Sequence, residues 1–261
     1  MRPVDVGIDA TQVLCTLGSG RVRAVFDRAI YLVVPGGLVV LVPTDAPRGP
    51  LHVRVETLPD IGPECLVWVD RHRLRIGDHC ILLDAPIWSP QLPPAASLAR
   101  ARGGARCWLP DLGPALDVGT VGRAELGAAA VTALRRGDVG TFAAEVGGRG
   151  PGLTPAGDDM MAGVLLVARA MWGASGMAAW THVQRKHLAR TNDIASAFLT
   201  CAAQGRCIEP AHDLLHGLAR GDHGAVSAAA ERLCHFGSSS GAALAYGLRA
   251  ALLELPPAPG P

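Results

Sequence analysis

Two adjacent aspartates, Asp158 and Asp159, join a glycine- and proline-rich run to an apolar segment in GGRGPGLTPAGDDMMAGVLL, residues 147–166. Glycine amides beside the positive end of a helix dipole form an arrangement that holds phosphate or carboxylate. Two carboxylates there oppose a bare anion. The predicted ligand therefore also carries an ammonium or an amide NH₂, or is an anion accompanied by Mg²⁺. Because adjacent helical residues point about 100° apart, we expect one aspartate to face the ligand while the other orients the loop.

The aspartates are the candidate catalytic groups. Thr154 is the predicted N-cap of the following helix, with Pro155 in the first turn, where its missing N–H costs no bond. An ordinary capped helix start is the alternative, and each aspartate then contributes up to about 1 kcal/mol through the dipole. We predict that replacement of either aspartate by Asn leaves folding nearly intact, and that at least one of the two variants loses ligand turnover or ligand binding. The candidate ligand-binding residues of this run are Gly150, Gly152, Leu153, Thr154, Pro155 and Gly157.

Two later stretches open helices with polar residues. The segment HFGSSSGAALAYGL, residues 235–248, is either a second anion site or an ordinary serine-capped helix. The segment ARTNDIASAF, residues 189–198, is either a polar opening of the same kind or a helix capped by Thr191 or Asn192. Helical domains often place such openings at one end of the bundle, where they converge. The candidate ligand-binding residues here are Gly237, Ser238, Ser239, Ser240, Gly241, Arg190, Thr191 and Ser196.

The elements that must position these residues fall into two halves. Short β-branched runs such as IYLVV and LVVLV fill the N-terminal part, separated by turn residues, and no helix of ordinary length fits between them. After Gly119 the composition changes to Ala, Leu and Arg at helical spacing. We predict an α+β protein with a mostly antiparallel, barrel-like sheet and an all-helical second half. The expected boundaries are a β-rich domain at 1–95, a connector at 96–118, a helical domain at 119–255 and a disordered tail at 256–261.

Composition narrows the function classes. The net charge is +1 and the charges are mixed along the chain, which disfavours nucleic acid and membrane surfaces as partners. Lys186 is the only lysine, so an anion site here relies on arginine or backbone amides. We expect a cytoplasmic protein with reduced cysteines and no structural metal. His212 and His216 have the spacing of zinc ligands, but solvent-facing histidines are the favoured interpretation.

The glycine-rich run resembles the signature of a bacterial family of unknown-function domains typified by AllH. The signature is G-x-G-P-G-L-T-P-S-G-D-D, and Ala156 stands where serine is usual. TNDIASAFLTCAAQG and GSSSGAALAYGL are similar to the family's later blocks, and GRVRAVFDRAIYLVV to its opening. The resemblance extends from about residue 18 to 252. A second departure is SSSGAAL, where an acidic residue often follows the glycine.

The resemblance implies a subunit of oxamate carbamoyltransferase, an enzyme of anaerobic allantoin breakdown, working with partner subunits on a small anion such as carbamoyl phosphate or oxamate. The glycine amides would hold phosphate or carboxylate, and Asp158 or Asp159 would accept hydrogen bonds from NH₂ and remove its proton. The S-x-R-T motif of the familiar carbamoyltransferases is absent. Two alternatives remain: a non-catalytic binding or scaffolding subunit, and a ribokinase-like kinase, whose G-A-G-D helix start resembles PAGDDMMAGVLL.

Overall fold

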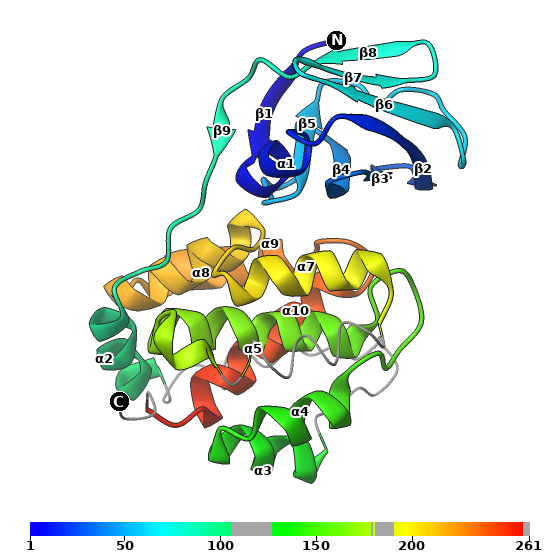
Figure 1. The fold of residues 1–261 in the computed structure, drawn as a ribbon. Coiled ribbons are helices and arrows are strands. Elements are labelled where there is room, and N and C mark those ends of the chain that lie inside the picture. The colour runs from blue at the N-terminus through cyan, green and yellow to red at the C-terminus, as the bar shows by residue number, and fades with distance from the viewer. Residues whose placement is uncertain (106–126, 179, 181–190, 258–261) are drawn as a thin grey trace. The chain divides into compact units, whose positions relative to one another are not determined.

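The computed structural model describes residues 1–105, 127–178, 180 and 191–257. The chain divides into two compact units, Met1–Pro90 and Gln91–Pro261 (Figure 1). Each unit has its own apolar core. No helix among the described residues is long and apolar enough to cross a membrane. The cysteines among the described residues are all free thiols.

The first unit is a single mixed sheet with the strand order β8-β7-β6-β2-β3-β4-β5-β1-β9. It curls into a half-barrel, with β8 and β9 at its two edges. A six-residue helix, α1, spans Ile8–Val13. The strands are β1 Pro3–Gly7, β2 Gly18–Phe26, β3 Ala29–Val34, β4 Gly37–Pro43, β5 His52–Val55, β6 Leu66–Asp70, β7 Arg73–Ile76, β8 His79–Leu82 and β9 Ile87–Trp88.

Alternation along the strands shows which face of the sheet packs on the core. Ile30, Leu32 and Val34 of β3 are buried and the residues between them are half-exposed, which is the pattern of a sheet with one face on a core. Strand β4 is buried on both faces, because α1 packs against it. The predicted antiparallel pairing is confirmed for most neighbours, but β4–β5 and β1–β9 are parallel. Strands β1, β7 and β9 lie outside the apolar runs that predicted strands.

The second unit is helical, as predicted. Helix α2 occupies the first part of the segment expected to be a connector, and residues 106–126 of that segment lie outside the described residues. The described helices are α2 Ala95–Ala105, α3 Ala128–Arg136, α4 Val139–Val146, α5 Ala156–Trp172, the short 3₁₀ turn η1 Ser175–Met177, α7 Asp193–Ala203, α8 Glu209–Arg220, α9 His223–Cys234 and α10 Ser240–Glu254.

Helix α5 is the centre of this unit. The spacing of Met161, Leu165, Ala168 and Trp172 predicts a helix with one buried face. In the structure α5 is buried around nearly its whole circumference, because α2, α4, α7 and α10 all pack on it. A helix that is apolar all round belongs inside a bundle. The site that opens α5 is therefore attached to the central, buried helix of the unit.

Two glycines bring α5 and α10 into backbone contact. A Cβ at Gly247 would lie 2.0 Å from the Met160 carbonyl oxygen, and one at Gly163 would lie 2.4 Å from that of Leu244. At the far end, Trp172 Nε1 donates to the Pro256 carbonyl at 3.2 Å. Since the Thr154 and Ser240 hydroxyls lie 2.8 Å apart at the helix starts, whereas Trp172 contacts Pro256 at the helix ends, α5 and α10 run side by side in the same direction. Their N-termini consequently lie at the same end of the bundle (Figure 1).

Candidate functional site

The loop between α4 and α5 has a backbone that only glycine adopts readily. Gly148, Gly150 and Gly152 have φ values of 67°, 111° and 101°, in the region where a Cβ is unfavourable. The loop folds back on α5, since the Gly157 N–H donates to the Arg149 carbonyl at 2.9 Å. A Cβ at Gly157 would lie 1.7 Å from the Val146 carbonyl oxygen. Gly157 thus serves loop packing, and its amide is used within the protein.

Thr154 is not the N-cap of α5, contrary to the prediction. The helix begins at Ala156 with Pro155 as N-cap, and no side chain caps it. The Thr154 hydroxyl instead lies 2.8 Å from the Ser240 hydroxyl, at the start of α10. Because Pro155 occupies the cap position, Thr154 lies one residue too early for its hydroxyl to reach the first-turn amides. Thr154 therefore joins two helix starts.

Asp158 is a buried, fully engaged carboxylate. Asp158 is only 2% exposed to solvent. Oδ1 accepts the Gly148 N–H at 2.9 Å and Oδ2 accepts the Thr191 hydroxyl at 2.5 Å. The prediction that either aspartate can be replaced with folding nearly intact assumes that both carboxylates are exposed. For Asp158 this assumption is wrong. Its carboxylate ties the glycine loop to the start of α7.

Asp159 differs from its neighbour. The hydroxyls of Ser240 and Thr154 hydrogen-bond its carboxyl group, yet its Oδ2 is buried and has no hydrogen-bond partner among the described residues. Burial raises the pKa of the Asp159 carboxyl well above its ordinary value, and the nearby Asp158 raises it further, while the two hydroxyls lower it. This carboxyl oxygen is the unsatisfied polar group of the site.

Asn192 has a place in the site that sequence reasoning did not give it. Its Oδ1 caps α7 by accepting the Ile194 and Ala195 N–H groups, both at 3.0 Å. Its Nδ2 donates to the Leu153 carbonyl at 2.8 Å. The sequence indicates the helix-capping role of Asn192 as one alternative. Its hydrogen bond to the Leu153 carbonyl depends on tertiary packing, which the sequence does not show. The role of Gly148 was not predicted for the same reason, because the loop must fold back before the Gly148 N–H can reach Asp158.

The starts of α5 and α10 share one property. Helices α4, α7 and α9 have side-chain caps from Asp138, Asn192 and Asp222, whereas α5 and α10, like α3 and α8, have none. The α10 N-terminus has no acidic residue in its first turn, whereas α5 has Asp158 and Asp159 there, which complement its partial positive charge. The Thr154 and Ser240 hydroxyls hydrogen-bond the Asp159 carboxyl between these two helix starts.

The remaining candidates divide by position. Ser239 is the N-cap residue of α10, and Gly237 and Ser238 are exposed in the preceding turn. Gly241 is a packing glycine, because a Cβ there would lie 1.8 Å from the Leu233 carbonyl oxygen. Ser196 hydrogen-bonds within α7, through its N–H to Asn192 and its carbonyl to Thr200. Arg190 lies outside the described residues.

No group of three His, Cys, Asp or Glu side chains in the described part of the chain could hold a metal ion. His212 is buried, so the prediction that it faces solvent is wrong. This burial lowers the pKa of His212 to about 4. Its Nε2 accepts the Cys207 N–H at 3.1 Å, and its Nδ1 and the His216 Nε2 both lie near the Gln91 carbonyl. Burial raises the pKa of the Cys207 thiol to about 12, so this thiol is no nucleophile at neutral pH.

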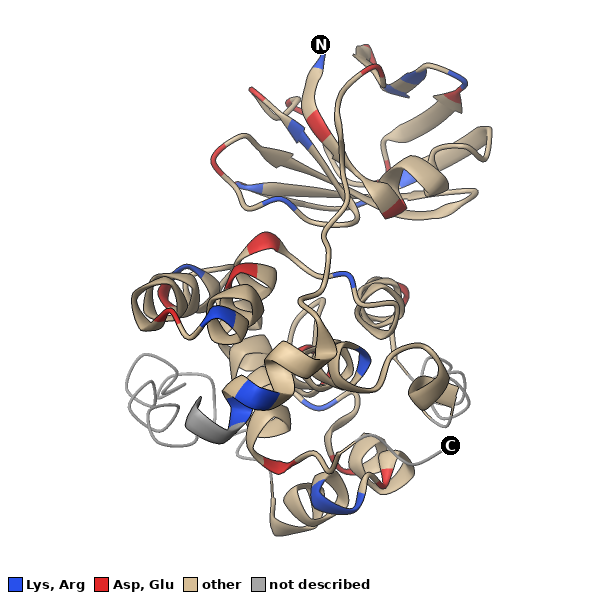
Figure 2. Ribbon diagram, turned by 90° about the vertical axis from the view of Figure 1, so that its left-hand side faces the viewer, with Lys and Arg blue, Asp and Glu red and all other residues tan. Residues whose placement is uncertain are grey.

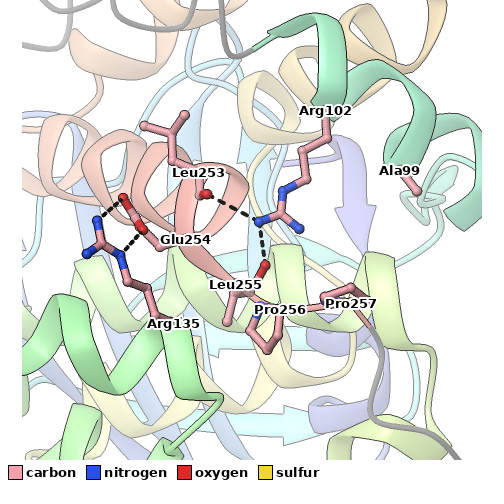
Figure 3. Close-up of a pocket in the computed structure, with 8 residues that line it drawn as sticks. All are labelled: Ala99, Arg102, Arg135, Leu253, Glu254, Leu255, Pro256 and Pro257. Carbon is pink, nitrogen blue, oxygen red and sulfur yellow. Dashed lines mark hydrogen bonds and ion pairs between the residues drawn. The ribbon is translucent and has the colours of Figure 1, made fainter.

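A pocket of about 840 Å³ lies at the opposite end of α10 (Figure 3). Arg102 donates to the carbonyls of Leu252, Leu253 and Leu255, which ends the helix by satisfying its last acceptors. Arg135 pairs with Glu254 at 2.5 Å. The arginines of this pocket are thus committed to the protein itself, and the glycine loop lies at the other end of the bundle.

Comparison with known families singles out the segment that carries the glycine loop. Residues 146–252 match the model of the AllH family, described as oxamate carbamoyltransferase subunit AllH. The matched segment includes the loop, α5, α7, α8 and α9 and most of α10. No curated protein and no solved structure matches the chain. The family resemblance seen in the sequence is confirmed for this segment of the helical unit.

Proposed function

We propose that the helical unit is the ligand-binding part of a carbamoyl-transferring enzyme and holds a small anion bearing an NH₂ group where α5 and α10 begin. The observation that carries the proposal is the buried Oδ2 of Asp159, which has no hydrogen-bond partner among the described residues. A buried polar atom without a partner costs about 1–3 kcal/mol, and an NH₂ donor from a ligand would remove that cost. The match to the AllH model supports the choice of ligand class.

The anionic end of the ligand would face the uncapped helix starts. The Thr154 and Ser240 hydroxyls donate to Asp159, so the candidate donors to the anion are the Ser239 hydroxyl and those first-turn amides that are not bonded within the protein, with Gly152 and Gly237 leaving the approach unobstructed. An anion at two helix N-termini is favoured by both dipoles. Asp158, Thr191 and Asn192 act as positioning residues, because their hydrogen bonds hold the loop against α7.

The chemistry of the forward reaction assigns a role to Asp159. The oxamate nitrogen attacks the carbonyl carbon of carbamoyl phosphate, the C–O bond to phosphate breaks, and the nitrogen loses one proton. The products are oxalurate and phosphate. Asp159 accepts that proton and returns it in the reverse direction. A carboxylate whose pKa is raised by burial is a stronger base than an exposed one, provided that it is ionised when the ligand is bound. An NH₂ hydrogen bond favours the ionised form.

Partner subunits are part of the proposal, because the matching family is described as one subunit of the transferase. The alternative is a subunit that binds the anion without turning it over. Turnover by the purified chain, alone and with partner subunits, separates these two functions. The ribokinase-like alternative is disfavoured by the fold, since such kinases place the motif on a parallel α/β sheet and here it begins a helix of the all-helical unit.

A bound Mg²⁺ fits this site poorly. Both Asp158 oxygens already accept hydrogen bonds from Gly148 and Thr191, and hydroxyls donate to Asp159. A divalent cation needs several oxygen ligands with free lone pairs, and the described residues offer one such oxygen, Oδ2 of Asp159. We therefore assign no step to the metal, and retain Mg²⁺ only as a condition in the binding experiment.

Isothermal titration of the full chain with oxamate, oxalurate, carbamoyl phosphate and nucleotides, each with and without Mg²⁺, tests the proposal. We expect binding of an amide-bearing anion to wild type and at least tenfold weaker binding to Asp159→Asn. Asp193→Asn is the matched control, because Asp193 is an exposed first-turn aspartate of α7. Binding of nucleotides alone, or equal binding by wild type and Asp159→Asn, would overturn it.

A further inference from the structure

The outer surface of the sheet in the first unit carries an apolar pair that faces solvent. Leu66 is 75% exposed and Trp68 is 54% exposed, and both lie on the outward face of β6, while Val67 and Val69 between and beyond them are buried. Large apolar side chains that share one sheet face at this exposure are uncommon in a monomer surface. β6 lies inside the sheet, between β7 and β2.

Arginines flank this pair on both neighbouring strands. The pairing register places Arg21 of β2 opposite Leu66, and Arg75 of β7 opposite Trp68. Directly opposed residues on one face have Cβ atoms about 4.5–5.5 Å apart. Arg73 follows on β7, on the same face as Arg75. We call this surface, made of Arg21, Leu66, Trp68, Arg73 and Arg75, the Trp68 face; Figure 2 shows the basic residues of the sheet in blue.

The charges of the Trp68 face are only partly compensated. Arg21 has a loose ion pair with Glu64 at 3.8 Å. Asp70 is paired across the hairpin with Arg73 in register, but its Oδ1 accepts the Arg71 N–H at 2.6 Å. Within the described residues, Arg73 and Arg75 have no acidic side chain within ion-pair distance. The two guanidiniums beside the exposed tryptophan are therefore available to carboxylates of another molecule.

We propose that the Trp68 face is the docking surface for a different protein, whose contact region places an apolar side chain between carboxylates. Exposed Trp and Arg are the residue types that dominate interface energetics, and the apolar centre with a basic rim fits that chemistry. A second copy docking through the same face would set Arg73 and Arg75 against their counterparts, and like charges in contact are unfavourable. Single-stranded nucleic acid needs successive aromatic platforms, whereas this face offers one tryptophan.

A photo-cross-linking side chain provides the test. We replace Trp68 by p-benzoylphenylalanine in the full chain, irradiate it in the cells that make the protein, and map the cross-linked peptides by mass spectrometry. The same replacement of Val4, another exposed apolar residue of the unit, is the control position. We expect position 68, and not position 4, to cross-link a different protein at a peptide that contains Asp or Glu beside an apolar residue.

Affinity measurements with that purified protein complete the test. Trp68→Ser and Arg75→Glu should each weaken binding at least tenfold, while Arg220→Glu, an exposed arginine of the helical unit, should change it less than twofold. Circular dichroism verifies that each variant folds, as expected for exposed positions. Cross-links only to this chain itself, only to nucleic acid or to nothing would overturn the proposal, as would an Arg75→Glu variant that binds like wild type.

Discussion

The side-chain oxygens of Thr154 and Ser240 lie 2.8 Å apart, although 86 positions separate the two residues. Each precedes or begins a helix of the same bundle, and both hydroxyls hydrogen-bond the Asp159 carboxyl. The pair therefore links two distant sequence motifs at a single proton-binding group. A substitution at either residue changes the surroundings of Asp159 without removing apolar contacts from the core.

Loss of either hydroxyl should move the pH dependence of ligand binding. Both hydroxyls lower the pKa of Asp159, so Thr154→Val and Ser240→Ala should each raise that pKa further. Binding that requires ionised Asp159 then begins at a higher pH in the variants than in wild type. Isothermal titration with oxamate between pH 5 and pH 9 measures the shift. Thr200→Val is the control, since the Thr200 hydroxyl bonds within α7. Superimposable profiles would contradict the assignment.

The free energy of unfolding of Asp159→Asn, relative to that of wild type, should increase as the pH rises. The pKa of Asp159 is raised by folding, so the folded state holds its proton more tightly than the unfolded chain, whose Asp pKa is about 3.9. Wild type loses stability from that pH upward until the folded-state pKa is passed. The gap between variant and wild type should therefore widen by at most about 1.4 kcal/mol per pH unit. Urea unfolding at pH 5 and pH 8 measures it. A variant less stable than wild type at pH 8 would contradict the explanation.

Asp158→Asn should have the opposite effect on stability. The amide can present only one oxygen, so either the Gly148 N–H or the Thr191 hydroxyl loses its acceptor. A buried donor left without a partner costs about 1–3 kcal/mol. Urea unfolding followed at 222 nm measures the loss, with the exposed Asp193→Asn variant expected within about 0.5 kcal/mol of wild type. Equal stability of both variants and wild type would show that Asp158 does not hold the loop.

Gly247→Ala should destabilise the helical unit and weaken ligand binding together. The added methyl would lie 2.0 Å from the Met160 carbonyl oxygen, so α5 and α10 must separate, at a cost of about 1–3 kcal/mol. Gly224→Ala in α9 is the matched control, because its Cβ meets only ordinary contacts, at 3.6 Å. Alanine there should be neutral or stabilise by up to about 1 kcal/mol. Thermal unfolding compares the pair, and equal midpoints would refute the close crossing.

Acid should destabilise the helical unit through His212. Burial lowers the pKa of His212 to about 4, while an unfolded histidine has a pKa of about 6.5. Between these values the unfolded chain binds more protons, so stability falls as the pH drops through this window, by roughly 3 kcal/mol in all. His212→Asn removes the titrating group and should flatten this part of the profile. The measurement is the free energy of unfolding of wild type and His212→Asn at pH 7 and pH 4.5. An equal loss of stability between these pH values in both proteins would exclude His212 as the cause of the acid sensitivity.

The sequence predicts the architecture well because periodicity reflects which faces are buried. Alternation in runs such as IYLVV reports a strand with one face on the core, and this strand is β3. The strand β7, RLRI, alternates equally well, with Leu74 and Ile76 buried, but it is short and begins with a charge. The parallel β4–β5 and β1–β9 pairs could not be predicted, since register between distant strands is decided by the whole sheet.

The candidate site was harder to predict, because its bonds join positions far apart in the chain. Sequence reasoning proposed that one aspartate faces the ligand and the other orients the loop. Residue types alone do not distinguish Asp158 from Asp159; burial and partners do. In the same way, Thr154 has the composition of an N-cap, yet Pro155 takes that position. The proximity of Ser240 to Thr154 follows from the close crossing at Gly163 and Gly247, which no local pattern indicates.

The common direction of α5 and α10 has an electrostatic consequence for the protein without its ligand. Antiparallel neighbours set opposite ends of their dipoles together, but here two N-termini, each equivalent to roughly half a positive charge, lie at one end. Asp158 and Asp159 in the first turn of α5 offset part of this charge, and a bound anion would offset more of it. The melting temperature should therefore depend on which anion the buffer contains, and multivalent phosphate or sulfate should raise it more than chloride does at the same ionic strength.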